Sequence, residues 1–377
     1  MSVMMTDCEG HLAQPGANMN YSERPYIVIW EMTQACDLAC VHCRACAKPL
    51  RHPLELTTAE GEGLIDQVAD LHVPVFVLSG GDPLKRPDLF TLVEYATMRG
   101  VRTSLTPSAT PLLTQAAIAE LQSSGLARLA VSLDGSTAEI HDAFRGIPGS
   151  YDLTLQAIRW ARELNLPVQI NTTITRRNLE DFDPMVGLLE SLDIVLWSVF
   201  FLVPTGRGQV GDLITGEESE ELFAKLYEIS RRAKFDIKTT EAPHYRRYVA
   251  QAQARERRLG FLLPFKKKTE DGIGRAPRGV NDAKGFVFIS HLGDVFPSGF
   301  LPLPAGNIRR LPLADIYRHS PLFRDLRDTS RLQGKCGACE FREICGGSRA
   351  RAFALTGDPL AEEPCCTYQP KAVATAA

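Results

Sequence analysis

Four cysteines stand within eleven residues near the N-terminus, in the stretch CDLACVHCRAC. Their spacing is Cys36-x3-Cys40-x2-Cys43-x2-Cys46. Thiolates bind soft metals, so zinc and iron–sulfur clusters are the candidate groups for this site. Read from Cys36, three cysteines would bind a cubane cluster and leave its fourth iron without a protein ligand. Such an iron can chelate a small molecule and pass an electron to it.

The same stretch can also be read from Cys40, where CVHCRAC resembles the CxxCxxC run of bacterial ferredoxins. That run continues to a fourth cysteine followed by proline, whereas Ala47-Lys48-Pro49-Leu50 follows here. The three-cysteine interpretation is therefore favoured, and it leaves Cys46 as a thiol outside the site.

A second group of cysteines lies near the C-terminus, as Cys336-x2-Cys339-x5-Cys345 followed by the pair Cys365-Cys366. Four thiolates suffice for zinc or for a second [4Fe–4S] cluster, and the residue types alone do not separate the two. Cysteines grouped in this way, in a chain without features of a secreted protein, favour metal sites over disulfides.

Composition excludes several classes of partner for this chain of 377 residues. The formal net charge of -3 argues against a nucleic-acid or membrane-surface partner. The first twenty residues lack the basic and apolar regions of a signal peptide. No apolar run reaches the ~18 residues needed to span a bilayer. We expect a cytoplasmic protein.

Strand and helix patterns alternate from residue 26 to residue 203. Apolar runs predict buried strands at 26–30, 73–80, 102–107, 127–135, 167–175 and 195–203. Amphipathic stretches predict helices at 57–71, 88–100, 114–125, 151–165 and 215–234, with Thr57 or Thr58 as the first cap and Gly100 and Gly125 at two C-terminal ends. Successive βα units imply a parallel sheet, doubly wound or barrel-like, with the site at the carboxyl ends of its strands.

The second half of the chain does not continue this regular alternation of strand and helix patterns. Residues 285–300, GFVFISHLGDVFPSGF, predict a small hairpin with its turn near Gly293. The stretch from His244 to Arg278 is rich in arginine and lysine. It is interpreted either as a solvated surface or as a cationic lid over a substrate that carries carboxylates.

The chain resembles the radical S-adenosylmethionine (SAM) enzymes over residues 25 to 205, through CDLACVHC, SGGDP (79–83) and the order of the βα units. The resemblance implies that Cys36, Cys40 and Cys43 bind a [4Fe–4S] cluster whose open iron is chelated by SAM. Reduction then cleaves SAM to methionine and a 5′-deoxyadenosyl radical, which abstracts a substrate hydrogen.

The resemblance also implies a set of SAM contacts. They are His42 near the adenine, Gly80, Gly81 and Asp82 at the methionyl amine, Ser132 and Arg145 at the carboxylate, and Asn171 at the ribose or carboxylate. Asp82 stands where the family more commonly has glutamate, and hydrogen bonding within the core is an equally good interpretation of Asn171.

The C-terminal stretch 336–368 resembles the SPASM or twitch domains that carry auxiliary clusters in radical SAM proteins. The resemblance implies that Cys336, Cys339, Cys345 and Cys366 bind a second [4Fe–4S] cluster. Full SPASM domains add cysteines in an upstream GxVxPC hairpin, and Ser298 takes that cysteine's place here. We therefore expect one auxiliary cluster and about eight irons per chain.

These resemblances predict the organisation of the chain. The fold class is α/β, a partial (β/α)6 TIM-like barrel with a small C-terminal iron–sulfur domain. The predicted segments are an N-terminal extension (1–24), the core barrel (25–205), a helical and basic connector (206–280) and the auxiliary-cluster domain (281–377).

Through residues 285–307 and 345–352 the chain further resembles the radical SAM proteins that modify tetrapyrrole side chains in haem, haem d1 and siroheme-derived pathways. This implies decarboxylation or deacetylation of a carboxyalkyl group, with a ferredoxin- or flavodoxin-type reductant and with Arg349 and Arg351 as further substrate contacts.

A radical enzyme that acts on a sugar or nucleoside stays possible, and two other functions also stay open at this point. One is the maturation of a ribosomally made peptide, although about 24 residues before the first strand are few for a leader-binding domain. The other is an electron carrier without SAM chemistry, which the SGGDP and SLDG (132–135) motifs disfavour.

Overall fold

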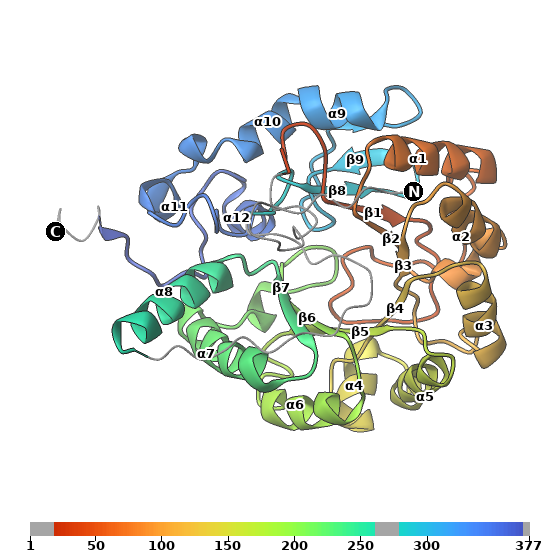
Figure 1. Cartoon of the computed structure of the whole chain (residues 1–377), viewed down its shortest axis with the longest axis horizontal. Coiled ribbons are helices and arrows are strands. Elements are labelled where there is room, and N and C mark those ends of the chain that lie inside the picture. Colours follow the sequence, from red (N-terminus) through yellow and green to blue (C-terminus); the bar gives the residue numbers. More distant parts are fainter. Residues whose placement is uncertain (1–18, 261–278, 372–377) are drawn as a thin grey trace.

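The computed structural model describes residues 19–260 and 279–371. Its centre is one ten-stranded sheet in the order β10-β9-β8-β1-β2-β3-β4-β5-β6-β7. The strands are β1 (Ile27–Glu31), β2 (Val75–Ser79), β3 (Thr103–Leu105), β4 (Arg128–Ser132), β5 (Val168–Ile174), β6 (Leu196–Phe201), β7 (Asp236–Thr240), β8 (Phe286–Ile289), β9 (Asp294–Phe296) and β10 (Gly306–Asn307). Strands β1 to β7 pair in parallel, β8 joins β1 in parallel, and the sheet curves without closing, as a partial barrel (Figure 1).

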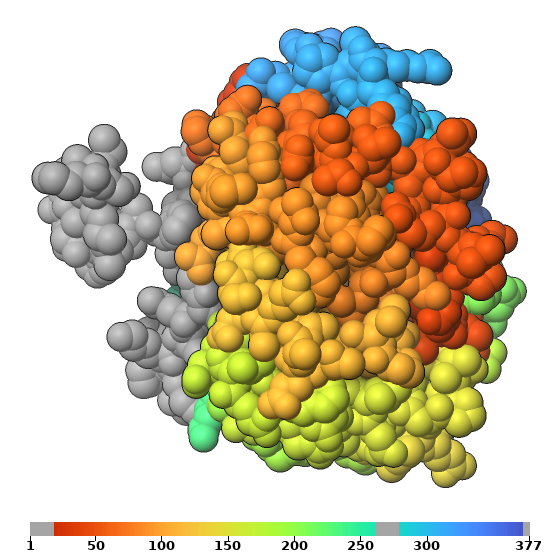
Figure 2. Space-filling model, turned by 90° about the vertical axis from the view of Figure 1, so that its right-hand side faces the viewer, coloured from red at the N-terminus to blue at the C-terminus, as the bar shows by residue number. Residues whose placement is uncertain are grey.

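Helices follow most of the parallel strands and lie on the outer, convex face of the sheet (Figure 1). They are α1 (Thr58–Asp70), α2 (Leu89–Met98), α3 (Gln115–Ser123), α4 (Ala138–Arg145), α5 (Ser150–Glu163), α6 (Phe182–Ser191), α7 (Gly216–Arg232) and α8 (His244–Arg258). After the hairpin come α9 (Leu313–His319), α10 (Pro321–Arg327), α11 (Gly334–Ala338) and α12 (Arg349–Thr356). In Figure 2 the segments from the red to the yellow part of the chain form a continuous outer surface in sequence order.

Local sequence explains where several helices begin and end. Thr57 caps α1 in a capping box, because its side chain accepts from the N–H of Glu60 and the Glu60 carboxylate accepts from the N–H of Thr57. Gly100 and Gly125 follow the last turns of α2 and α3 with φ of 72° and 95°, a conformation that glycine adopts without steric cost. These predicted boundaries are confirmed.

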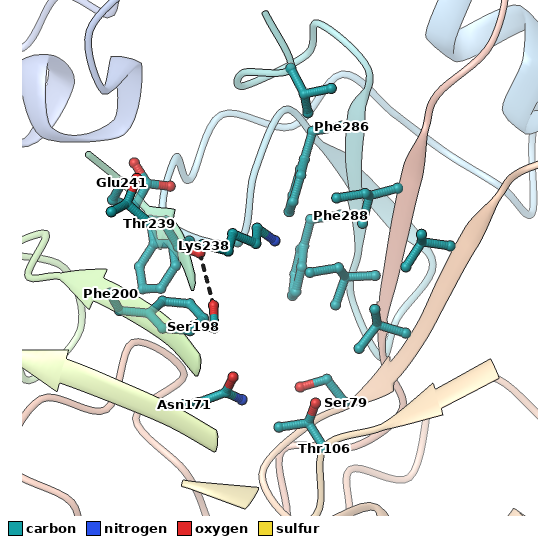
Figure 3. A pocket seen from close by; sticks show the side chains of 18 of the residues that line it. Ser79, Thr106, Asn171, Ser198, Phe200, Lys238, Thr239, Glu241, Phe286 and Phe288 are labelled. Atoms are coloured by element: carbon teal, nitrogen blue, oxygen red, sulfur yellow. Dashed lines mark hydrogen bonds between the residues drawn. The ribbon is translucent and has the colours of Figure 1, made fainter. Parts of the chain in front are cut away.

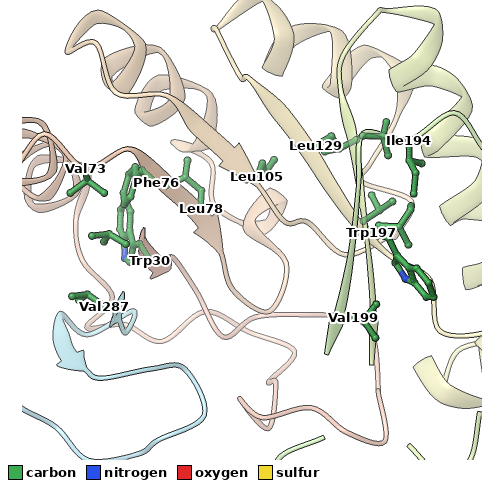
Figure 4. Close-up of a cluster of buried hydrophobic side chains, with 14 of the residues drawn as sticks. Trp30, Val73, Phe76, Leu78, Leu105, Leu129, Ile194, Trp197, Val199 and Val287 are labelled. Atoms are coloured by element: carbon green, nitrogen blue, oxygen red, sulfur yellow. The ribbon is translucent and has the colours of Figure 1, made fainter. Parts of the chain in front are cut away.

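The core lies between the sheet and its helices. Trp30, Phe76 and Leu78 pack on one side of it and Trp197 and Val199 on the other, and all five are fully buried (Figure 4). Alternate residues on each strand face the other way, into the barrel. Strand β5 shows this alternation clearly, since Val168, Ile170 and Thr172 are buried while Gln169, Asn171 and Thr173 line the interior. The interior is lined by both apolar and polar side chains, and a site can be built on this face.

The six predicted strands are confirmed as β1 to β6, and the predicted hairpin as the antiparallel pair β8–β9. The sheet also continues past residue 205, where the barrel was expected to end. Strand β7 lies in the segment predicted as a connector, and β8 lies in the segment predicted as the auxiliary domain. Among the described residues, no helix is both long enough and apolar enough to cross a bilayer.

Candidate active site

The first cysteine cluster forms a loop directly after β1, at the carboxyl end of the sheet. Cys36 and Cys40 are buried and Cys43 is half-buried, and all three line one cavity. Cys46 is exposed and does not line this cavity. The structure thus brings together the three thiols of the CxxxCxxC pattern and leaves the fourth outside. We refer to this cavity as the cysteine cavity.

The SGGDP loop after β2 holds the cysteine loop in place. The N–H of Gly81 donates to Thr33 O and the N–H of Asp82 donates to Ala35 O, both at 2.7 Å. A Cβ on Gly81 would lie 2.5 Å from Ala35 O, so only glycine permits this approach. The close contact that requires glycine here is therefore with the backbone before Cys36.

Asp82, the acidic residue of the SGGDP loop, bonds to neighbouring protein groups. Its carboxylate is fully buried away from the cysteine cavity and accepts from the N–H groups of Leu84 and Ser108 and from the Thr110 hydroxyl. Burial raises the pKa of Asp82 to about 6, although the Thr110 bond opposes the shift. Asp82 thereby ties the end of β2 to the segment after β3, and its contact with the SAM amine stays a prediction. Gly80 and Gly81 do line the cavity.

The far wall of the cysteine cavity is made by residues at the ends of β4 and β5 and by α4. Ser132, Asn171 and Arg145 line it. The Arg145 guanidinium pairs with the buried Asp134 and lies 3.6 Å from Cys40 Sγ, while its Nε has no hydrogen-bond partner among the described residues. A buried guanidinium with an unpaired N–H suits a ligand carboxylate.

His42 completes the rim of this cavity. Its ring centroid lies 4.5 Å from that of Phe144, and its Nδ1 is buried without a hydrogen-bond partner within residues 19–260 and 279–371. Burial, reinforced by Arg145 and Arg207, holds the pKa of His42 well below its usual range, so the ring is neutral. A neutral ring with an apolar face fits beside a purine.

The loop after β6 supports the cysteine loop from the other side. The N–H of Arg207 donates to Cys43 O at 2.9 Å. Gly206 has φ of 60°, and a Cβ there would overlap the carbonyl oxygens of Cys43 and Arg44. This loop was not singled out from the sequence, although PTGRG follows a predicted strand.

Replacing Gly206 with alanine is expected to lower the free energy of unfolding by about 1–3 kcal/mol, because the new methyl group meets backbone atoms and the residue keeps a positive φ. It should also reduce iron retention, because the Cys43 carbonyl must move. Gly211→Ala is the matched control, since a Cβ there meets nothing within 4 Å. Urea unfolding and iron analysis of both variants measure the effect, and equal behaviour of the two would contradict this role for Gly206.

A second cavity fills the interior of the barrel, and we call it the barrel cavity. Figure 3 shows Phe286 and Phe288 on one wall and Phe200 on the opposite wall, with Lys238 extending into the space between them. The cations that line it are Arg44, Arg128, Lys238 and Arg246. The barrel and cysteine cavities adjoin, because Arg44, Ser79, Thr106, Asn171, Phe200 and Phe300 line both.

The C-terminal cysteines form a separate site. Cys336, Cys339, Cys345 and Cys366 line one small cavity together with Arg247. Backbone N–H groups donate to three of the sulfurs, from Glu363 to Cys336 at 3.3 Å and from Phe341 and Gly347 to Cys339 and Cys345 at 3.4 Å. Such bonds are typical around cluster thiolates, whose reduction potential they tune.

Cys365 is turned away from this cavity toward Arg351 and Glu363. Burial raises the pKa of Cys345 to about 12 and that of Cys366 to about 11, so metal binding at these thiols would release protons. In the described residues no three His, Cys, Asp or Glu side chains surround a single-ion site. A cubane differs from a single ion, because each of its thiolates binds a different iron.

Comparison with known proteins identifies the family. A family model of the radical SAM superfamily matches residues 30–189. The AdoMet-dependent heme synthase of Methanosarcina barkeri is 43% identical over 346 residues, which cover 92% of this chain and 97% of that protein. This chain belongs to the radical SAM superfamily.

Two further likenesses have lower sequence identity. The PqqA peptide cyclase of Rhodopseudomonas palustris is 31% identical over 356 residues, covering 92% of this chain and 88% of that protein. The crystal structure of Streptococcus suis SuiB bound to S-adenosylmethionine superposes with a TM-score of 0.68 at 18% identity, covering 92% of this chain and 78% of SuiB. This second likeness concerns the fold alone.

As a radical SAM enzyme, the chain uses a [4Fe–4S] cluster and SAM. The cysteine cavity fits these groups by its chemistry, because it is lined by three thiols, by the glycine backbone at 80–81 and by Arg145, whose Nε has no hydrogen-bond partner within residues 19–260 and 279–371. An electron carrier needs the thiols but not the glycine backbone and the arginine.

The structure does not place Arg349 and Arg351 where a substrate could reach them. Both are fully buried. Arg349 donates to Pro359 O and Ala361 O, and Arg351 pairs with Glu363 at 2.9 Å. Neither lines the barrel or the cysteine cavity, so the expected substrate contacts are wrong. Of the basic stretch, residues 244–258 form α8, where Arg247 pairs with Glu220, and residues 261–278 lie outside the described part of the chain.

Proposed function

We propose that this radical SAM enzyme decarboxylates carboxyalkyl side chains of a tetrapyrrole in a haem-type pathway. The observation that carries the proposal is the barrel cavity, with aromatic side chains on opposite walls, four cations along it and a direct junction with the cysteine cavity. Flat apolar rings suit aromatic walls, and carboxylates suit guanidinium and ammonium groups. The heme synthase relative supports this substrate class by name.

In this proposal Cys36, Cys40 and Cys43 hold the SAM-binding cluster. When bound, this cluster supplies the electron that cleaves SAM into methionine and the 5′-deoxyadenosyl radical. Ser132, Arg145 and Asn171 then hold the polar parts of SAM, and the neutral His42 ring packs beside its adenine. The glycine backbone at 80–81 leaves room for the methionyl group.

Cys336, Cys339, Cys345 and Cys366 are proposed to hold the auxiliary cluster, which accepts one electron per side chain when bound. The 5′-deoxyadenosyl radical removes one hydrogen atom from the carbon next to the ring. The bond to the carboxylate then breaks, carbon dioxide leaves, and a vinyl group and one electron remain. The enzyme's electron count is then unchanged over one turnover, because one electron is given to SAM and one is recovered from the substrate radical. A ferredoxin- or flavodoxin-type protein would supply the electron that first reduces the SAM-binding cluster.

The anaerobically reconstituted protein tests the proposal. With SAM, a strong reductant and Fe-coproporphyrin, it is expected to form carbon dioxide, vinyl-bearing porphyrin and 5′-deoxyadenosine in proportion. A reaction without porphyrin gives the uncoupled rate. If Fe-coproporphyrin does not raise 5′-deoxyadenosine formation above this rate, whereas a candidate precursor peptide does, the chain is a peptide maturase and the proposal fails.

A further inference from the structure

Arg44 follows directly after Cys43 and lies at the junction of the two cavities. Among the described cationic side chains, it alone lines both of them. Arg128, Lys238 and Arg246 line only the barrel cavity, and Arg145 lines only the cysteine cavity. A carboxylate bound by Arg44 would therefore be the one closest to the place where the radical forms.

The guanidinium of Arg44 lies beside a buried carboxylate and over an aromatic ring. Its Nη2 lies 3.1 Å from Glu31 Oε1, and its central carbon stands 4.2 Å from the centroid of the Phe288 ring. The other oxygen of Glu31 is 2.9 Å from Nδ1 of His291. Glu31 and His291 are buried, so this arrangement is anchored inside the protein.

The Glu31 carboxylate is charged in this environment. Burial acts to raise its pKa, but Arg44 and His291 outweigh burial, and the pKa of Glu31 lies below its usual range. The ion pair with Glu31 leaves other N–H groups of Arg44 to bind a second partner, because a guanidinium has five N–H groups in a planar fork. The Arg44 side chain keeps 21% of its surface exposed, on the side of the cavities.

We propose that Arg44 binds the substrate carboxylate that the reaction removes. This rests on the function proposed above. The bidentate contact places the carbon next to the ring, two bonds from the carboxylate carbon, toward SAM in the cysteine cavity. When the carbon–carbon bond breaks and carbon dioxide leaves, Arg44 loses its partner, and an auxiliary cluster held by the C-terminal cysteines would take up the remaining electron. The vinyl product is then bound more weakly at this point, which allows the next side chain to take its place.

Equilibrium binding of two porphyrins tests this role. Coproporphyrin III has propionates where protoporphyrin IX has two vinyl groups, and both are fluorescent without iron. For the reconstituted holoprotein with SAM, Arg44→Gln is expected to weaken coproporphyrin binding about tenfold or more while leaving protoporphyrin binding within about twofold. Arg44→Lys, which keeps the charge but not the fork, should lie between the two.

The controls separate this inference from the proposed function. Arg162→Gln removes a surface arginine paired with Asp193 and should change neither affinity. The iron content of Arg44→Gln is measured beside that of the unmodified protein, and if Arg44→Gln loses iron, Arg44→Lys carries the comparison. An equal loss for both porphyrins, or no loss, overturns the role of Arg44. If the unmodified protein binds neither porphyrin, the proposed function itself fails.

Discussion

Cys40→Ala protein, reconstituted without oxygen, is expected to bind about four irons per chain in place of about eight and to form 5′-deoxyadenosine only at background level. Cys40 is buried against Arg145 in the cysteine cavity, and no other thiol lines this cavity apart from Cys36 and Cys43 among the described residues. Without the third thiolate the cluster has too few ligands to persist. The remaining iron belongs to the C-terminal site.

Cys46→Ala is the matched control for this result. Cys46 lies three residues from Cys43 in the same loop, but its side chain is exposed and outside the cavity. This variant should keep about eight irons and the SAM cleavage of the unmodified protein. Loss of SAM cleavage in Cys46→Ala would contradict the assignment of Cys36, Cys40 and Cys43.

The second large effect is expected at the auxiliary site. Cys366→Ala should also fall to about four irons per chain, because Cys366 is one of the four thiols that line the C-terminal cavity. SAM cleavage should continue, since the cysteine cavity is untouched. Product formation should stop, because the electron from the substrate radical then has no acceptor. The ratio of product to 5′-deoxyadenosine measures how much of the SAM cleavage leads to product.

Cys365→Ala is the matched control for Cys366→Ala, because the two cysteines are adjacent in the sequence. Its thiol faces Arg351 and Glu363 and not the C-terminal cavity. Iron content and the product ratio should therefore match the unmodified protein. The opposite pattern, with Cys365 required and Cys366 dispensable, would show that the two adjacent thiols are assigned the wrong way round.

Much of the barrel could be predicted from the sequence, because strands β1 to β6 are apolar runs and helices α1, α2, α3, α5 and α7 have amphipathic patterns. Thr57 and Gly100 mark boundaries through chemistry within a few residues of the chain. Strand β7, with the sequence DIKTT, has no apolar run and forms because β6 offers a paired edge. Strand β8 pairs with β1 although most of the chain separates the two strands in sequence. No local sequence pattern predicts this pairing.

The residues of the site also fall into some that could be predicted from the sequence and others that could not. Cysteine spacing predicted which thiols share a cavity, because ligand spacing is a local property. The contact between Arg44, Glu31 and His291 includes a residue from a distant part of the sequence, since His291 lies far along the chain from the other two, so no local pattern predicts it. Asp82 and Arg351 were taken as ligand-binding groups because carboxylates and guanidiniums suit that purpose. In both cases neighbouring protein groups bond to the side chain.

Hydrogen transfer from the substrate tests the proposed reaction most directly. Fe-coproporphyrin deuterated in its propionate side chains would be incubated anaerobically with SAM, reductant and the reconstituted enzyme, and the 5′-deoxyadenosine analysed by mass spectrometry. If the enzyme decarboxylates these side chains, the 5′-deoxyadenosine carries deuterium in step with the vinyl groups formed. Unlabelled 5′-deoxyadenosine, with no vinyl-bearing porphyrin, would contradict the proposed function.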